Sequence, residues 1–252
     1  MTIKLSLIMI VKNEADNLAS CLKSVKGLAQ EIIVVDSGSQ DETVSIAQSF
    51  GAKIYKRDFD SFTLQKNYAL SKAAGEWVLN LDGDEALSDA LREEIKNTLP
   101  ATDKAGFMLP IANEFLGRKM KHSGLKRVMK LRLAKRAQAA YTGGKIHEAL
   151  RVEGPVGVLK NIVTHRPYRS IHQYFNKFNF YSTLAAQSMH ERGKKFSYLQ
   201  LLRPFFDFFK TYVLRLGFLD GLEGFLWAYL GAQYPLVKYV KLKRLHSLQE
   251  EE

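Results

Sequence analysis

Apolar runs alternate with amphipathic segments over the first hundred residues. The runs typical of buried strands are 5–11, 31–35, 52–55 and 77–81. The segments in which apolar residues recur every three to four positions, the period of a helix, are 15–26, 43–50 and 62–74. Strict alternation of strands and helices predicts an α/β fold, a mostly parallel sheet flanked by helices.

The second half is patterned differently. Strands are expected at 107–111 and 128–133, and the second of these alternates so that one face is basic. Helical spacing follows over 170–189, 202–216 and 222–234, and Pro235 should break or kink the chain. We therefore expect a catalytic domain over 1–190, with halves 1–100 and 101–190, and an amphipathic helical extension over 191–252.

Charge separates the two halves of the chain. Residues 1–100 hold 11 Lys and Arg against 15 Asp and Glu, whereas residues 101–252 hold 26 against 11. The basic half should face an anionic partner such as a nucleic acid, a phosphorylated glycan or an anionic lipid surface. The single cysteine, Cys21, excludes an internal disulfide. No window is long and uncharged enough for a membrane span, and the first residues lack the pattern of a signal peptide.

Acidic residues stand where the predicted strands end. Glu14 and Asp36 follow the first two strands, and Asp82, Asp84 and Glu85 follow the fourth. Ligands of such sheets bind at the carboxyl ends of the strands. Closely spaced carboxylates repel one another, and Mg²⁺ or Mn²⁺ would offset their charge. The alternative is a solvated acidic turn before a helix. A glycine-rich phosphate loop is absent after the first strand.

Four motifs occur in a characteristic order. They are Leu7–Glu14, Val34–Thr43, Gln65–Asn67 and Leu81–Glu85. In order and spacing they resemble the family 2 glycosyltransferases. The resemblance implies the GT-A fold, a nucleotide-sugar donor and an Asp-x-Asp metal motif.

The resemblance also implies individual roles. The implied donor-binding residues are Val11, Asn13, Glu14, Asp36, Lys66 and Asp82. Asp36 corresponds to the acid that recognises the nucleotide base, and Lys66 stands where the family often has Arg. Asp84, together with Asp82, corresponds to the ligands of a Mg²⁺ or Mn²⁺ ion.

The segment Tyr141–Glu148 resembles the His-Glu stretch of bacterial lipopolysaccharide-core glucosyltransferases. An inverting transfer needs a base that deprotonates the acceptor hydroxyl. On this resemblance Glu148 is the expected base, and the alternative is a polar pair at a strand–loop junction. The expected phosphate or acceptor contacts are His147, His165 and Arg132.

A broader resemblance, over about residues 1–245, is to the lipopolysaccharide inner-core beta-1,4-glucosyltransferases. Its markers include His165–Tyr168 and Gly217–Gly221. It implies transfer of glucose from UDP-glucose to a heptose of a lipid-linked, phosphorylated glycan. The expected location is cytoplasmic, peripherally attached to the inner membrane of a bacterium.

Other functions remain open from the sequence. A polyprenyl-phosphate glycosyltransferase would share the donor motifs and a lipid-facing C-terminus. A basic nucleic-acid-binding protein would explain the charge of the second half, but acids at the strand ends would repel phosphates, so no nucleic-acid partner is expected. The mixture of aromatic, aliphatic and basic residues after residue 200 suits an anionic membrane surface, and a helical pair packed on the domain or against a second copy is the alternative.

Overall fold

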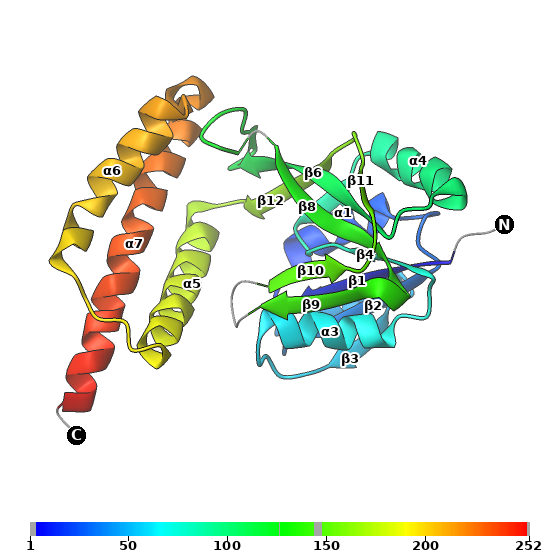
Figure 1. The fold of residues 1–252 in the computed structure, drawn as a ribbon, viewed down its shortest axis with the longest axis horizontal. Coiled ribbons are helices and arrows are strands. Elements are labelled where there is room, and N and C mark those ends of the chain that lie inside the picture. The colour runs from blue at the N-terminus through cyan, green and yellow to red at the C-terminus, as the bar shows by residue number, and fades with distance from the viewer. Residues whose placement is uncertain (1–3, 126, 144–147, 251–252) are drawn as a thin grey trace. The chain divides into compact units, whose positions relative to one another are not determined.

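The computed structural model describes residues 4–125, 127–143 and 148–250, and within it the chain forms two compact units. The first comprises Met1–Ala112 and Val128–His165, and the second comprises Asn113–Arg127 and Arg166–Glu252. Figure 1 shows both units and labels their elements where there is room. The predicted domain boundary at residue 190 stays a prediction.

Four parallel strands form one half of the main sheet, in the spatial order β3-β2-β1-β4. Their bounds are β1 Leu5–Val11, β2 Glu31–Asp36, β3 Lys53–Lys56 and β4 Trp77–Asn80. The central strand β1 is buried on both faces, as the uniformly apolar sequence predicts. All four strands lie where the hydrophobic pattern placed them.

Helices cover both faces of this half-sheet (Figure 1). They are α1 Ala15–Ser24, α2 Thr43–Ser49, α3 Phe62–Lys72 and α4 Asp89–Thr98. Leu7 and Met9 of β1 share a core cluster with residues of α1, α2 and α4. Ile8, whose side chain points to the opposite face, shares a second cluster with α3 and with Tyr141 of a small antiparallel hairpin. The predicted α/β architecture is confirmed.

The sheet continues beyond β4 with strands of mixed direction. The order is β4-β8-β6-β12-β5, with short strands β7 and β11 beside β6. The bounds are β5 Glu85–Leu87, β6 Gly106–Phe115, β7 Arg118–Lys119, β8 Val128–Lys135, β11 Val156–Val158 and β12 Val163–Tyr168. The separate hairpin consists of β9 Ala139–Gly143 and β10 Glu148–Val152.

The basic strand β8 is an interior strand of this sheet. It pairs with β4 on one side and β6 on the other. The segment is therefore not a solvated edge strand. The two cations that alternation would place on one basic face differ in exposure, since Lys130 is exposed whereas Arg132 is buried.

The second unit is mainly helical. Its helices are α5 Ile171–Glu191, α6 Arg203–Phe209 and α7 Gly221–Glu250. A π-helical turn (Lys210–Leu214) and a short 3-10 helix (Gly217–Asp220) connect α6 to α7. Phe115, Met120 and Tyr174 are buried among partly exposed rings, and the Trp227 ring centroid lies 5.3 Å from that of Phe115.

Helix α7 continues through Pro235, so the chain does not break at this residue, and the alternative of a kink stays a prediction. Proline lacks an N–H and cannot bond the carbonyl of Gly231, four residues earlier, but packing of α7 against α5 and α6 outweighs this local cost. No helix in the described parts of the chain is both long and apolar enough to cross a bilayer.

Two glycines of α7 provide a test of how this helix packs against the preceding 3-10 helix, Gly217–Asp220. A Cβ at Gly224 would collide with the carbonyl oxygen of Gly217, whereas one at Gly231 would meet nothing within 4 Å. Gly224→Ala should lower the free energy of unfolding by about 1–3 kcal/mol, the usual cost of overpacking. Gly231→Ala, the matched control, should raise it by about 0.5–1 kcal/mol because alanine favours the helix. Thermal and denaturant unfolding measure both, and equal effects would contradict this packing.

Candidate functional site

The loops that follow β1 and β2 are joined through one side chain. The N–H of Asn13 donates to Ser39 Oγ at 2.9 Å, and Asn13 Oδ1 accepts from the N–H of Gln40 at 2.8 Å. Asn13 has a φ of 54°, in the left-handed region that asparagine tolerates. Val11 lies directly opposite Asp36 in the parallel ladder. The three residues expected at the donor site thus share one edge of the sheet.

Asp36 is buried and closes its own turn. Its carboxylate accepts from the N–H of Gly38 at 3.1 Å and from that of Ser39 at 3.2 Å. These contacts fix the direction of the loop after β2. The role of Asp36 in base recognition stays a prediction.

The acidic turn after β4 lies against the loop after β1. A Cβ at Gly83 would lie 3.1 Å from both Cβ and Cγ of Glu14. A side chain at position 83 would therefore crowd Glu14, whose side chain would have to shift by a few tenths of an ångström. Burial raises the pKa of the Cys21 thiol well above its usual value, and the carboxylates of Glu85, Asp84, Asp82 and Glu14 raise it further.

Arg132 of β8 neutralises two of these acids. Its guanidinium donates to Asp82 Oδ2 at 2.7 Å and to Glu85 Oε1 at 2.6 Å. Glu85 is fully buried, and its other oxygen accepts from the N–H of Asp82 at 3.1 Å. Burial disfavours the charge of Arg132, but Asp82 and Glu85 outweigh this effect and raise its pKa. Arg132 holds the acidic turn in place.

Lys66 of α3 links the acidic turn to the small hairpin. Its ammonium lies 2.8 Å from Glu148 Oε1 and 3.3 Å from Asp82 Oδ1, and its side chain is only 4% exposed. Desolvation would raise the pKa of Asp82, but Arg132 and Lys66 outweigh it and hold that pKa well below its usual value. Four residues expected at the site therefore form one ionic network: Lys66, Asp82, Arg132 and Glu148.

The amide side chain of Asn67, on α3, positions the β9–β10 hairpin. Asn67 Nδ2 donates to the carbonyl of Tyr141 at 2.8 Å, and the N–H of Tyr141 donates to Asn67 Oδ1 at 2.9 Å. Tyr141 is buried, and Lys66 Nζ lies 5.9 Å from its ring centroid. Because β9 pairs with β10, this anchor also fixes the start of β10 at Glu148.

Asp84 lies near a histidine. His165 Nε2 is 3.4 Å from Asp84 Oδ1. The backbone brings them together because His165 of β12 is the register partner of Glu85 in β5. His147 lies outside the described residues, so its predicted contact stays a prediction.

The donor set suits a divalent cation. Three carboxylates (Asp82, Glu85 and Glu148) contact the cations Lys66 and Arg132, and a fourth, Asp84, lies beside His165. Asp84 and His165 offer an oxygen and a nitrogen side by side. No three His, Cys, Asp or Glu side chains among residues 4–125, 127–143 and 148–250 are arranged around a common metal position. The assignment of Asp84 and Asp82 as ligands stays a prediction.

Sequence reasoning did not assign Glu85, Asn67 or Tyr141 a part in the site. Asn67 was available as the last residue of a recognised motif, and Tyr141 as the first of another. Glu85 carried no separate signal, because a third acid after a strand also starts a helix or turn. Its structural role depends on Arg132, 47 positions later.

Comparisons with known proteins agree with this fold. Residues 6–150 match the family model "Glycosyl transferase family 2". An uncharacterized glycosyltransferase of Rickettsia typhi is 31% identical over 96% of this chain and 87% of its own length. The lipopolysaccharide core biosynthesis glycosyltransferase LpsC of Rhizobium meliloti is also 31% identical, over 97% of this chain and 94% of its own.

Among solved structures, S. aureus TarS (residues 1–349) in complex with UDP-GlcNAc is similar in fold. It has a TM-score of 0.50 and 12% identity, over 98% of this chain and 92% of that one. The fold is thus that of the GT-A glycosyltransferases. The chain belongs to glycosyl transferase family 2 and is an enzyme of that class. The resemblance, the fold class and the enzyme class expected from the sequence are confirmed.

The buried guanidinium predicts a pH-dependent loss of stability. Arg132→Met should lower the free energy of unfolding at pH 7 by about 3 kcal/mol, because Glu85 is left buried without its cation and Asp82 loses one of two. In the native chain the depressed pKa of Asp82 stabilises the fold above its unfolded-state pKa of about 4. That contribution is lost as the pH falls through the lower folded-state value.

The difference between native chain and variant should therefore be largest near neutral pH and shrink below about pH 4. Denaturant unfolding across this range measures it. Arg151→Met is the matched control, since Arg151 is exposed on β10. Equal losses for the two variants, or a difference independent of pH, would contradict the assigned role of Arg132.

Proposed function

We propose that the chain transfers glucose from UDP-glucose, with inversion, to a heptose of the lipopolysaccharide inner core. The observation that carries the proposed reaction is the bridge made by Lys66, which contacts both Asp82 of the donor motif and Glu148, the expected base. The acceptor proposal is supported by the similarity to LpsC, a lipopolysaccharide core biosynthesis glycosyltransferase, along nearly the whole chain.

The proposed donor site lies along the carboxyl ends of β1, β2 and β4. Val11, Asn13 and Glu14 line the nucleoside, and Asp36 recognises its base. Lys66 and Asp82 stand beside the sugar and diphosphate. The shared sheet edge and the ionic network support this placement. Arg132 supplies positive charge near the diphosphate and keeps Asp82 oriented.

Glu148 is the proposed base. It takes the proton of the acceptor hydroxyl as that oxygen bonds to the anomeric carbon, while the bond from this carbon to the diphosphate breaks on the opposite face. The contact with Lys66 places a cation at its carboxylate and orients it. His147 and His165 are the proposed neighbours of the phosphates or the acceptor.

A Mg²⁺ or Mn²⁺ ion is the proposed cofactor, held by Asp84 with Asp82 as a second ligand and with His165 beside them. When bound, it would neutralise the charge that develops on the departing diphosphate. The acceptor is a lipid-linked, phosphorylated glycan, so we propose that the enzyme works at the cytoplasmic face of a bacterial inner membrane, attached peripherally.

Donor and metal use can be tested together. UDP-glucose with Mn²⁺ should raise the unfolding temperature of the chain more than UDP-galactose or UDP-GlcNAc with Mn²⁺ does. Asp84→Ala should abolish the metal-dependent part of the shift and lower transfer by about 100-fold or more, since Lewis-acid stabilisation is worth several kcal/mol. Asp103→Ala, at an exposed carboxylate, is the control. A metal-dependent shift that survives in Asp84→Ala would move the metal site elsewhere.

The choice of acceptor distinguishes a lipopolysaccharide-core glucosyltransferase from a polyprenyl-phosphate glycosyltransferase. Heptose-terminated core glycolipid should accept glucose, and polyprenyl phosphate should not. Transfer to polyprenyl phosphate alone would replace the proposed acceptor and leave the donor assignment intact.

Glu148→Gln should separate chemistry from donor binding. The amide keeps the shape but cannot take a proton, so kcat should fall by about 10²–10⁴-fold. The UDP-glucose shift in unfolding temperature should change far less. Glu153→Gln, an exposed carboxylate one residue beyond the same strand, should transfer like the native chain. Native-like kcat in Glu148→Gln would assign the base to another group.

A further inference from the structure

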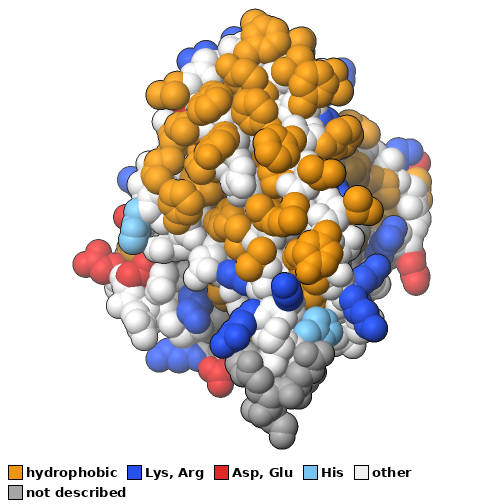
Figure 2. All heavy atoms as spheres, turned by 90° about the vertical axis from the view of Figure 1, so that its left-hand side faces the viewer, with side chains coloured by type: hydrophobic (Ala, Val, Ile, Leu, Met, Phe, Trp, Pro, Cys, Tyr) orange, Lys and Arg blue, Asp and Glu red, His pale blue; other side chains and the backbone are white. Residues whose placement is uncertain are grey.

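The second unit exposes an unusually large set of hydrophobic side chains. Fifteen large ones between Tyr198 and Tyr229 are exposed, and Phe205, Leu199 and Tyr198 are 75%, 74% and 72% exposed. Figure 2 shows hydrophobic side chains gathered over one broad face of this unit. We name the exposed hydrophobic side chains of residues 198–229 the apolar face. Monomeric soluble proteins rarely expose so extended an apolar surface, so a partner should cover it.

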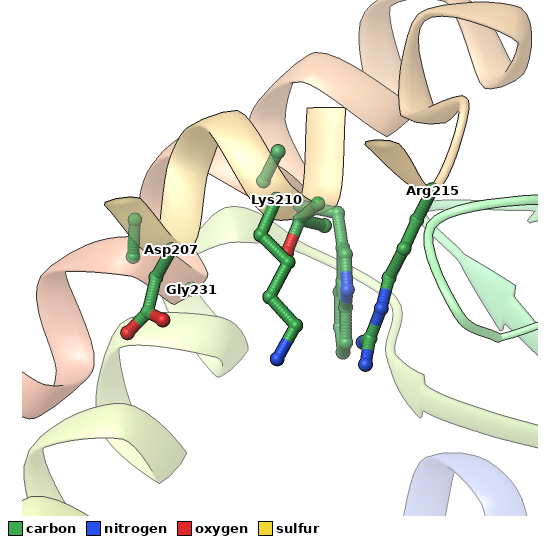
Figure 3. Close-up of a pocket in the computed structure, with 8 residues that line it drawn as sticks. Asp207, Lys210, Arg215 and Gly231 are labelled. Atoms are coloured by element: carbon green, nitrogen blue, oxygen red, sulfur yellow. The ribbon is translucent and has the colours of Figure 1, made fainter. Parts of the chain in front are cut away.

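Helical spacing separates this face from a polar side of the same segment. Phe205, Phe206 and Phe209 recur on one side of α6. Asp207 of α6 and Lys210 and Thr211 of the following π-helical turn line a cavity of about 240 Å³ together with residues of α7. Figure 3 shows Lys210 and Arg215 extending to the same side at this cavity. Segment 198–229 is therefore amphipathic, and its polar side is directed into the unit.

Basic residues border the apolar face. Between residues 192 and 247 there are ten Lys and Arg against three acidic residues. Asp220 is buried and accepts from the N–H groups of Lys121 and His122, and Asp207 is paired with Arg203. The acids are thus largely engaged within the unit. The exposed basic residues include Arg192, Lys194, Lys195, Lys243 and Arg244.

A lysine of the basic border contacts aromatic rings at the edge of the apolar face. Lys243 of α7 lies 5.4 Å from the ring centroid of Phe196 and 5.9 Å from that of Tyr198. Figure 2 shows Lys and Arg side chains directly beside the hydrophobic surface. An ammonium above aromatic rings at the edge of an apolar surface matches the boundary between acyl chains and head groups.

We propose that the apolar face lies in the surface of an anionic bilayer, with its aromatic and aliphatic side chains among the acyl chains and its basic border on lipid phosphates. Charge disfavours a second copy of the chain as the partner, because two such faces would bring basic borders together. The segment binds in the plane of the membrane, since the described helices include none able to span it. This deepens the proposed function, which places the acceptor on the same surface.

The full-length chain should sediment with vesicles of phosphatidylcholine mixed with phosphatidylglycerol. Binding to phosphatidylcholine alone should be weaker, and salt should weaken binding to the mixed vesicles. The triple variant Phe205→Ser/Phe206→Ser/Phe209→Ser should lose about 10-fold or more in affinity, since three buried phenyl groups are removed from the lipid. These side chains are exposed in the free protein, so its unfolding temperature should be retained.

Val156→Ser/Val158→Ser, exposed valines of β11 in the other unit, is the matched control and should bind like the native chain. Tyr198→Ser/Leu199→Ser is a second test at the other end of the apolar face. If both face variants bind vesicles as the native chain does, the proposal is overturned. It is also overturned if the native chain ignores vesicles and forms a dimer that the triple variant cannot form.

The Glu148→Gln variant distinguishes this proposal from the proposed function. It should bind vesicles like the native chain although transfer is lost. Vesicle binding with no glucose transfer by the native chain would leave the docking surface standing and refute the reaction. Glucose transfer to a solubilised acceptor without vesicle binding would leave the reaction standing and refute the docking surface.

Discussion

The site depends on two buried cations that hold repelling carboxylates together. The sheet directs Asp82, Asp84 and Glu85 to one edge, where they would repel each other in a poorly hydrated environment. Arg132 binds two oxygens from separate acids, and Lys66 adds a second positive charge. Their effect on Asp82 is large enough to lower its pKa despite desolvation.

The same cations connect elements that are distant in the chain. Lys66 on α3 reaches both the turn after β4 and Glu148 on the hairpin, and Asn67 beside it bonds the backbone of β9. Helix α3 thus sets the position of the expected base relative to the donor motif. Gly83 completes this arrangement, because its lack of a side chain lets the acidic turn approach Glu14.

The two units differ in the kind of surface that they present. The first concentrates charged groups at the end of a rigid sheet, which suits a small, anionic donor. The second has only a modest aromatic core and exposes many of its hydrophobic side chains, with cations beside them. Transfer of such a surface from water into lipid is favourable, so it suits the lipid that anchors the proposed acceptor.

The sequence by itself determined the parallel half of the sheet, its helices and the family, because buried strands and amphipathic helices leave local periods in the chain and the motifs follow strand ends. It named Asp82, Arg132 and Glu148 but not their contacts. Those pairs lie 50 and 82 positions apart (Asp82 with Arg132, Lys66 with Glu148), and local patterns carry no information on such distances. Only the tertiary structure placed β8 inside the sheet, where it pairs with β4 and β6. Helix α7 likewise continues through Pro235 because packing against neighbouring helices outweighs the tendency of proline to end a helix.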